Sequence, residues 1–311
     1  MNVLRERIWL VYTTLAALSW SVWGTLTKYV SGEVNPYTYQ ILFTAGMLFS
    51  LPFVIYRCKK KDVNLKGIVW GTSTGLLAVI GNISVYQSFK MGGQASVVIP
   101  FTNLYSLVTI LIALLIFKEK IRLINGIGIL IVVPAIIILS GQSQLFTGPG
   151  LFFQHMKPEI WVLFAFLALF LFGLFSATQK LTANFIPTEW SYLSFIASSV
   201  LISVGFILSG LVEFKFSTQT FWVGSLAGLV DGLGVLFVYA AYRAGGKASQ
   251  VSPVVATLQQ LFTIGLALSL LKEKLSMVEF AGIGLAVIGS WFLLSDKKVI
   301  PIRPLDFKLL N

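Results

Sequence analysis

Asp231 is the residue of this chain best placed to do chemistry in an apolar setting. It lies near the middle of a long apolar run, and no other of the 12 acidic residues lies so deep in one. A carboxyl group at the bilayer centre costs about 2.5 to 3.5 kcal/mol on insertion scales, so we interpret it as functional. It is a candidate for binding an amine or for exchanging protons or another cation. The structural alternative is a neutral Asp that hydrogen-bonds to a neighbour.

Two apolar segments carry matching polar stripes at helical spacing. In the first segment the stripe comprises Ser96, Pro100, Asn103, Ser106 and Thr109. In the second it comprises Ser249, Pro253, Ala256, Gln260 and Thr263, with Thr257 and Gln259 on its flanks. Polar groups are costly in lipid, so we expect each stripe to face a cavity or another helix. Hydrogen bonding between helices is the alternative, and it suits Ser and Thr better than the larger Asn103 and Gln260.

Pro100 and Pro253 occupy equivalent positions in these segments. Each ends a repeated phrase, GGQASVVIP at 92–100 and GGKASQVSP at 245–253. A proline removes one backbone hydrogen bond and frees a carbonyl group one turn earlier. Matched interruptions of this kind point to a binding site or its hinges, so we predict that both prolines are hinges.

Other candidate cavity residues lie in neighbouring apolar segments. The set is completed by Trp20, Trp23, Asn82, Tyr86, Gln179 and Tyr239. Asn82 provides a polar group on the face that matches the face of Asp231, and we expect Tyr86 and Tyr239 near opposite mouths of one central cavity. Trp20 and Trp23 lie in mid-segment, away from the interfaces where Trp usually anchors. For these two, packing in the core or against lipid is the alternative.

The elements that position these residues are predicted to be membrane helices. The chain is 56% hydrophobic and 11% charged, whereas soluble domains carry about 25% charged residues. Ten segments are long enough to cross a bilayer, near 9–30, 37–56, 67–89, 94–117, 121–140, 159–182, 188–210, 221–243, 247–271 and 275–295. Such long apolar runs do not suit barrel strands. The predicted fold class is an all-α polytopic membrane protein with ten transmembrane helices.

The composition also excludes several kinds of chemistry. One His and one Cys do not make a transition-metal site of the usual kind. The chain has no Gly-rich phosphate loop and no nucleophile elbow, so we predict no catalytic residue, metal or cofactor. Cys58 is interpreted as an inert thiol in a basic loop. The net charge of +11 sits in short loops between apolar segments, a pattern that topology explains better than binding to nucleic acid.

The distribution of Lys and Arg predicts the orientation. With the N-terminus in the cytoplasm, 17 of the 23 basic residues lie on the inside. The positive-inside rule therefore favours a multi-pass protein of the cell inner membrane with both termini cytoplasmic.

The repeated phrase belongs to a longer internal repeat. Residues from about 75 to 140 match residues 228 to 295 at an offset of 153 and then 154, as for KEK at 118–120 and 272–274. The match continues to GIG at 126–128 and 282–284, which are 156 positions apart. Five spans in each half give the halves opposite orientations, an arrangement typical of secondary transporters. We predict a first repeat at 1–145, an external linker at 146–158, a second, inverted repeat at 159–296 and a basic cytoplasmic tail at 297–311.

These motifs resemble those of the drug/metabolite transporter superfamily, and of its EamA-type group in particular. The resemblance rests on the Trp23–Gly24 pair, the repeated phrases, the KEK sequences and the GIG sequences, and it covers nearly the whole chain. One departure is that Pro36 is followed by Gln40 and not by the Arg found in many members. The resemblance implies transport of amino acids, related metabolites or amphipathic drug-like compounds.

We therefore expect a secondary active transporter of a small organic solute that works by alternating access and is proton-coupled through Asp231. A passive uniporter or an exchanger of the same fold is the main alternative. A lipid-handling protein or membrane enzyme fits less well, because the chain offers no catalytic group at an interface. The expected partners are a small-molecule substrate and the lipid bilayer, with no nucleic acid, and the sequence leaves a monomer and a homodimer open.

Overall fold

The computed structural model describes residues 8–58, 63–115, 123–139 and 159–294, and all regular structure in these ranges is helical. The helices are α2 (Ile8–Val30), α3 (Pro36–Leu48), α4 (Leu51–Arg57), α5 (Leu65–Lys90), α6 (Ala95–Asn103), α7 (Tyr105–Leu115), α8 (Leu123–Leu139), α9 (Ile160–Phe185), α10 (Thr188–Leu208), α11 (Thr218–Arg243), α12 (Ala248–Leu270) and α13 (Met277–Leu294). Each lies on one of the predicted apolar segments. The KEK sequence at 118–120, the predicted linker at 146–158 and the predicted tail at 297–311 lie outside the described residues.

Several helices are built to cross a membrane. Six in the described ranges are long and apolar enough, and the number becomes seven when α3 and α4, which meet at 45°, count as one span. α6 and α7 continue one another and give the candidate span Ala95–Ile112. The outer faces of α9 and α10 expose large apolar side chains, among them Leu163, Phe166, Phe170, Leu201 and Leu208. Such faces suit lipid, where a helix satisfies its own backbone.

Local sequence explains where several helices begin. Asn35 caps α3 by accepting a hydrogen bond from the Thr38 amide at 2.8 Å, and Pro36 occupies the first helical turn. Ser217 caps α11 in the same way through the Thr220 amide at 3.0 Å. Side-chain caps of this type satisfy backbone donors that the first turn of a helix leaves free.

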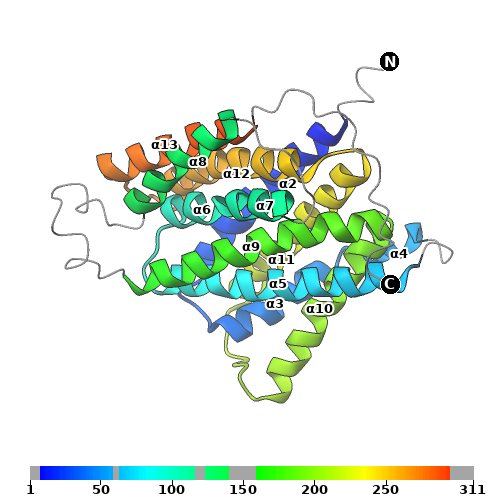
Figure 1. Ribbon diagram of the computed structural model, residues 1–311. Helices are drawn as coiled ribbons and strands as arrows, with labels where there is room; N and C mark the ends of the chain where they lie inside the picture. The colour runs from blue at the N-terminus through cyan, green and yellow to red at the C-terminus, as the bar shows by residue number, and fades with distance from the viewer. Residues whose placement is uncertain (1–7, 59–62, 116–122, 140–158, 295–311) are drawn as a thin grey trace.

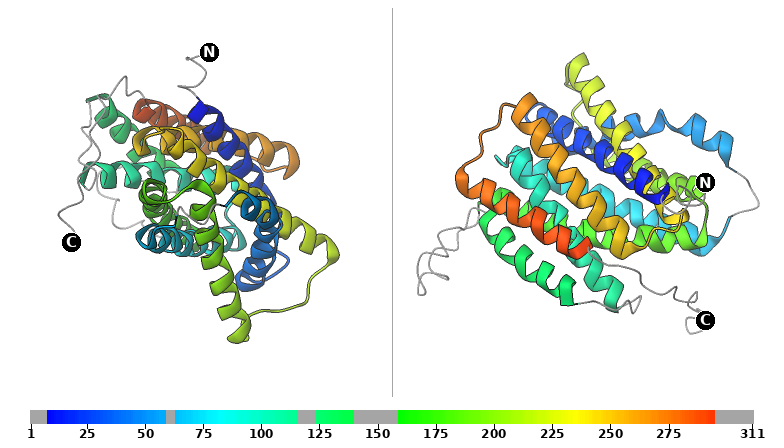
Figure 2. Two further views of the ribbon diagram at one scale, coloured as in Figure 1. Left: turned by 90° about the vertical axis from the view of Figure 1, so that its right-hand side faces the viewer. Right: turned by 90° about the horizontal axis from the view of Figure 1, so that it is seen from above.

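The helices associate reciprocally between the two halves of the chain. α2 packs on α11 and α12, while α9 packs on α5, α6 and α7. α3 packs on α11, while α10 packs on α5. α8 and α13 lie side by side at one edge of the bundle, and α10 projects from the opposite edge (Figures 1 and 2). Each helix in the first half thus has a partner in the second half.

Glycines allow two of these crossings to bring backbones together. A Cβ atom at Gly228 of α11 would lie 1.8 Å from the Phe43 carbonyl oxygen of α3. A Cβ atom at Gly75 of α5 would lie 2.7 Å from the Phe195 carbonyl oxygen of α10. Small residues permit such approaches in membrane bundles, where van der Waals contact drives helix association.

Candidate functional site

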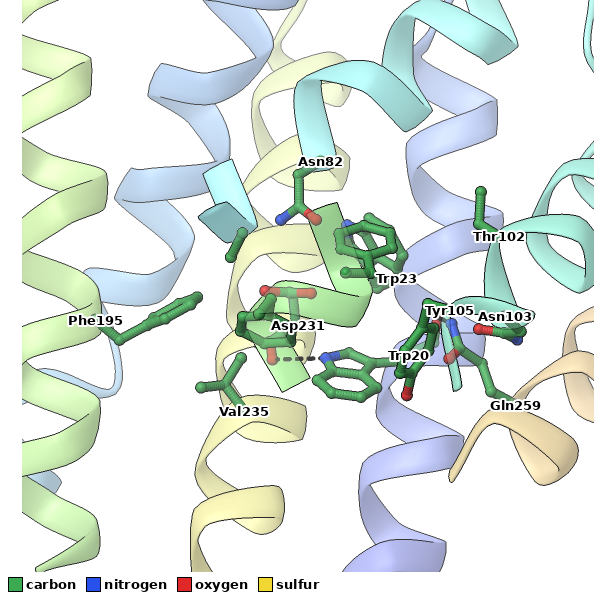
Figure 3. Close-up of a pocket in the computed structure, with 13 residues that line it drawn as sticks. Trp20, Trp23, Asn82, Thr102, Asn103, Tyr105, Phe195, Asp231, Val235 and Gln259 are labelled. Carbon is green, nitrogen blue, oxygen red and sulfur yellow. Dashed lines mark hydrogen bonds between the residues drawn. The ribbon is translucent and has the colours of Figure 1, made fainter. Parts of the chain in front are cut away.

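A narrow pocket lies where helices of the two halves meet at the centre of the bundle. Its walls come from α2, α5 and α6 in the first half and from α9, α10, α11 and α12 in the second half, with Tyr105 of α7 (Figure 3). The free volume is about 30 Å³, which is room for about one water molecule. This pocket therefore has to widen before it can hold an organic solute.

Five of the predicted cavity residues line this pocket. They are Trp20, Trp23, Asn82, Asn103 and Asp231. Asn82 of α5 and Asp231 of α11 both line the pocket, and Phe195 projects toward it from α10 (Figure 3). The side-chain nitrogen of Asn103 is buried and has no hydrogen-bond partner.

The side chain of Asp231 lies in the pocket wall with little exposure to solvent. The residue is 5% exposed and lines the pocket. Among the described residues, none forms a hydrogen bond or ion pair with the side chain of Asp231; only its backbone carbonyl accepts one, from the indole N–H of Trp20 at 3.3 Å. A buried carboxyl group without a partner is costly. An ammonium group or a proton supplied from outside the protein would relieve that cost.

Aromatic rings surround this carboxyl group. The Trp20 ring lies 6.2 Å from that of Phe175, and the Trp23 ring lies 6.4 Å from that of Phe172 in an edge-on arrangement. Tyr105 lies 6.3 Å from Phe172. The pocket lining contains no Lys, Arg or His. Such a lining favours a cation or an apolar group over an anion.

The predicted tyrosines lie outside the pocket. Tyr86 is fully buried, donates its hydroxyl to the Val34 carbonyl at 2.7 Å and stacks on Tyr39 with ring centroids 4.5 Å apart. It therefore ties α5 to the connection between α2 and α3. Tyr239 is also fully buried.

The predicted polar residues of α9 and α12 are buried elsewhere. Gln179, Thr257 and Gln260 are each at most 5% exposed, and none lines the pocket. Both side-chain polar atoms of Gln260 lack a partner, as does the hydroxyl of Thr257. Buried amides almost always find partners, so this part of α12 holds unmet hydrogen-bonding capacity.

The predicted hinges lie within helices. Pro100 is inside α6, which ends three residues later at Asn103. Pro253 is inside α12, which continues to Leu270. The one-residue interruption at Leu104 therefore follows Pro100 by about one turn.

Eight pocket residues were not among the predicted site residues, and half of them are aromatic. They are Ala78, Thr102, Tyr105, Phe172, Phe175, Phe195, Val235 and Gln259. The internal repeat carries a signal for Phe172, which lies 152 residues after Trp20. A Cβ atom at Gly234 would approach the Trp20 indole nitrogen to 2.5 Å, and one at Gly81 would approach the Phe172 ring to 2.5 Å. Each ring therefore packs on the equivalent glycine of the opposite half.

A second, larger cleft lies at the end of the bundle where α2 begins. Its volume is about 560 Å³. The first half contributes Ile8, Tyr12 and Arg57 among others, and the second half contributes Glu189 and Arg243 among others. The halves are therefore parted at this end.

Metal-binding and thiol chemistry find little support. In the described part of the chain, no group of three or more His, Cys, Asp or Glu side chains could hold a metal ion. Cys58 is a free thiol, and burial, with a smaller contribution from the Glu189 carboxylate, raises its pKa above the ordinary value. A thiol of that kind is not activated for nucleophilic attack.

Apolar helices around a narrow, partly polar pocket define a multi-pass α-helical membrane protein. Residues 7–141 match the EamA-like transporter family, which indicates an EamA-like transporter domain in this part of the chain. The match confirms the predicted family for the first half. An uncharacterized protein of Methanocaldococcus jannaschii is 26% identical over 121 residues, which cover 38% of this chain and 85% of that protein.

The fold also matches a solved crystal structure of a protein. The TM-score is 0.63 with 18% sequence identity, and the match covers 91% of this chain and 96% of the other. At that identity the similarity concerns the fold alone.

Proposed function

We propose that this protein is a secondary transporter that moves a small organic solute across the cytoplasmic membrane by alternating access. The observation that carries the proposal is the unpartnered, buried Asp231 carboxyl group in a pocket between the two halves. Substrate sites of such transporters lie near the midplane, between repeats of opposite orientation. The proposed substrate is an amino acid, a related metabolite or an amphipathic compound.

The proposal includes ten spans in two inverted five-helix repeats. The main contacts exchange when the two halves are exchanged: α2 with α11 corresponds to α9 with α5, and α3 with α11 corresponds to α10 with α5. The glycine contacts exchange in the same way, because Gly228 approaches α3 as Gly75 approaches α10. An inverted repeat accounts for this reciprocity.

An ammonium group suits the pocket as the recognised part of the solute. Asp231 supplies the opposite charge, and the faces of Trp20 and Phe175 supply the aromatic surface that cations favour. Asn82 and Asn103 provide amides for a polar or carboxylate end. The small pocket volume requires that the walls separate to admit the solute.

Asp231 is also the proposed proton-coupling residue. A carboxyl group that serves protons and an ammonium solute in turn couples the two, because one site cannot hold both at once. A uniporter or an exchanger would use the same pocket without proton coupling. We place both termini in the cytoplasm because of the excess of Lys and Arg on that side.

Counterflow in proteoliposomes tests this function. A thermal-shift screen of amino acids and amines on the purified protein first identifies a ligand, and uptake of that ligand is then measured across a range of pH. We expect Asp231→Asn to lower uptake at least tenfold and to abolish its pH dependence, while Glu279→Gln behaves as the parent protein. Unchanged uptake and pH profile in Asp231→Asn would contradict coupling through this residue. A screen in which no compound shifts stability or is transported would contradict the transport of such solutes.

A further inference from the structure

Glu273 of the second half caps a helix of the first half. This residue lies between α12 and α13, in the second KEK sequence. Its two carboxylate oxygens each accept a backbone N–H at 2.9 Å, one from Ala95 and one from Ser96, and the Ser96 hydroxyl donates to the same carboxylate at 2.6 Å. Three hydrogen bonds thus join the two halves at a single carboxylate.

The start of α6 depends on this carboxylate. The residue at the N-cap position, Gln94, makes no side-chain capping bond. The first backbone N–H groups of a helix have no partner within the helix, and the helix dipole favours negative charge there. Hydrogen bonds to an ionised group are stronger than neutral ones. Glu273 therefore caps the N-terminus of α6 from the opposite half, a role that a Ser or Asp next to the helix plays elsewhere.

Lys28 strengthens the same contact from α2. Its ammonium group donates to the Gly93 carbonyl at 2.7 Å, directly before α6, and it interacts electrostatically with Glu273. It also lies 5.7 Å from the centre of the Phe89 ring. We call Lys28, Ala95, Ser96 and Glu273 together the clasp.

The turn that precedes the clasp recurs in the second half. Lys180 of α9 donates to the Gly246 carbonyl at 3.1 Å and lies 5.3 Å from the centre of the Tyr242 ring. These residues stand 152 or 153 positions after Lys28, Gly93 and Phe89. The lysine, the glycine turn and the ring therefore form one device that each half possesses. Glu119, the sequence counterpart of Glu273, lies outside the described residues.

The clasp and the large cleft lie at opposite ends of the bundle. Lys28 is in the last turn of α2, whereas Ile8 and Tyr12, in its first turns, line the cleft of about 560 Å³ between the halves. The hollow beside the clasp, between Gly93 and Glu279, is smaller, at about 220 Å³. The two halves are therefore in contact at the clasp end and separated by a cleft at the other end.

From this arrangement we infer that the clasp is a gate. It holds the halves together at the end of α2 that carries Lys28, and it must break when the protein changes to the conformation that opens this end. Glu273 and Lys28 are thus gating residues that set the balance between two conformations and do not touch the solute. The inference rests on the alternating access of the proposed function.

Distance measurements between spin labels test the gate without any substrate. Cys58 is the only cysteine, so Cys58→Ser gives a background free of other thiols. One label pair reports the clasp end, at Met91 and Met277, which are 46% and 88% exposed. A second pair reports the cleft end, at Tyr56 and Asn184, both exposed. The protein is reconstituted in lipid nanodiscs.

We expect Glu273→Gln to reduce the clasped population roughly tenfold, the effect of weakening charge-assisted hydrogen bonds. The Met91–Met277 distances should lengthen while the Tyr56–Asn184 distances shorten. Glu279→Gln is the matched control. Glu279 also caps a helix N-terminus, but it does so within its own half, by accepting the Ser276 amide at 2.8 Å. In the Glu279→Gln variant, the distance distributions of both label pairs should equal those of the parent protein.

Two outcomes would overturn the inference. One is a Glu273→Gln protein with unchanged distances at both ends, and the other is a change at the clasp end alone, which would mean local fraying of α6. If Glu273→Gln does not fold, Ser96→Ala tests the gate in its place. This variant keeps both backbone donors and removes only the hydrogen bond from the Ser96 hydroxyl to Glu273. Its distances should then change in the same directions by a smaller amount, and unchanged distances would contradict the gate. These distance measurements need no substrate, so failure of the transport assay would not affect them.

Discussion

The indole N–H of Trp20 donates to the backbone carbonyl of Asp231 at 3.3 Å, joining α2 of the first half to α11 of the second half (Figure 3). This bond places a Trp ring beside the buried carboxyl group. It also crosses the interface at which the two halves are proposed to move. The pocket and the association of the halves therefore share one contact.

Removing that contact should weaken ligand binding more than folding. Trp20→Phe keeps an aromatic ring against Phe175 and loses the hydrogen bond, which is worth about 1 kcal/mol. We expect the affinity for an ammonium ligand to fall about fivefold or more, since a Phe face also binds cations less well than a Trp face. Isothermal titration measures the affinity, and thermal unfolding measures the stability. An unchanged affinity would exclude Trp20 from the binding site.

The crossing of α3 and α11 should not tolerate a side chain at Gly228. Gly228→Ala would place a Cβ atom 1.8 Å from the Phe43 carbonyl oxygen, and overpacking of this kind costs about 1 to 3 kcal/mol or more. We expect a clearly lower melting temperature in detergent. Gly265→Ala is the control, because nothing lies within 4 Å of a Cβ atom there, and it should melt like the parent protein or slightly higher. Equal melting of the two variants would show that the crossing adapts.

Tyr86 should matter for stability and not for ligand recognition. Tyr86→Phe removes the hydrogen bond to the Val34 carbonyl and keeps the stack on Tyr39. The expected loss is about 1 kcal/mol of stability, with unchanged ligand affinity because Tyr86 lies outside the pocket. Thermal unfolding and titration on the same preparation separate the two quantities. A large loss of affinity at unchanged stability would return Tyr86 to the cavity, as its position in the sequence suggested.

Gln260 should matter more for the transport cycle than for the stability of the conformation described above. Both of its polar atoms are buried without a partner, and exchanging such a group for an apolar one of similar size is nearly neutral or stabilising. We expect Gln260→Leu to keep or raise the melting temperature while it lowers counterflow, because the amide finds partners in the other conformation. Thr263→Val is a parallel case one turn along, with a hydroxyl that also lacks a partner. A lower melting temperature with full counterflow would contradict this explanation.

The positions of the helices could be predicted well from the sequence. In lipid a backbone satisfies its hydrogen bonds only within helices or closed barrels. A long apolar run therefore predicts a helix. The segment near 9–30 became α2 at Ile8–Val30, and that near 188–210 became α10 at Thr188–Leu208. The interruption within 94–117 was predicted at Pro100, whereas the helix breaks at Leu104.

The pocket could be predicted only in part. Asp231, Asn82 and the two Trp residues stand out, because polar or amphipathic groups in mid-span are costly or unusual. Phe195 carries no such signal, since an aromatic residue in an apolar run suits lipid and core equally, and Phe172 is marked only by its equivalence with Trp20 in the repeat. Glu273 gave no signal of a distant partner, because a charged residue in a loop is unremarkable until the fold brings α6 to it.

The sequence by itself determined that the chain crosses a membrane in apolar helices and that its two halves repeat, because hydropathy and internal repetition are local properties of the chain. Only the tertiary structure decided which helices meet: that Trp20 reaches Asp231, that Gly228 admits Phe43, and that Glu273 caps α6. Each of these contacts joins residues more than 170 positions apart. Association among equally apolar helices depends on shape and on a few hydrogen bonds, and neither can be read from composition or spacing along one helix.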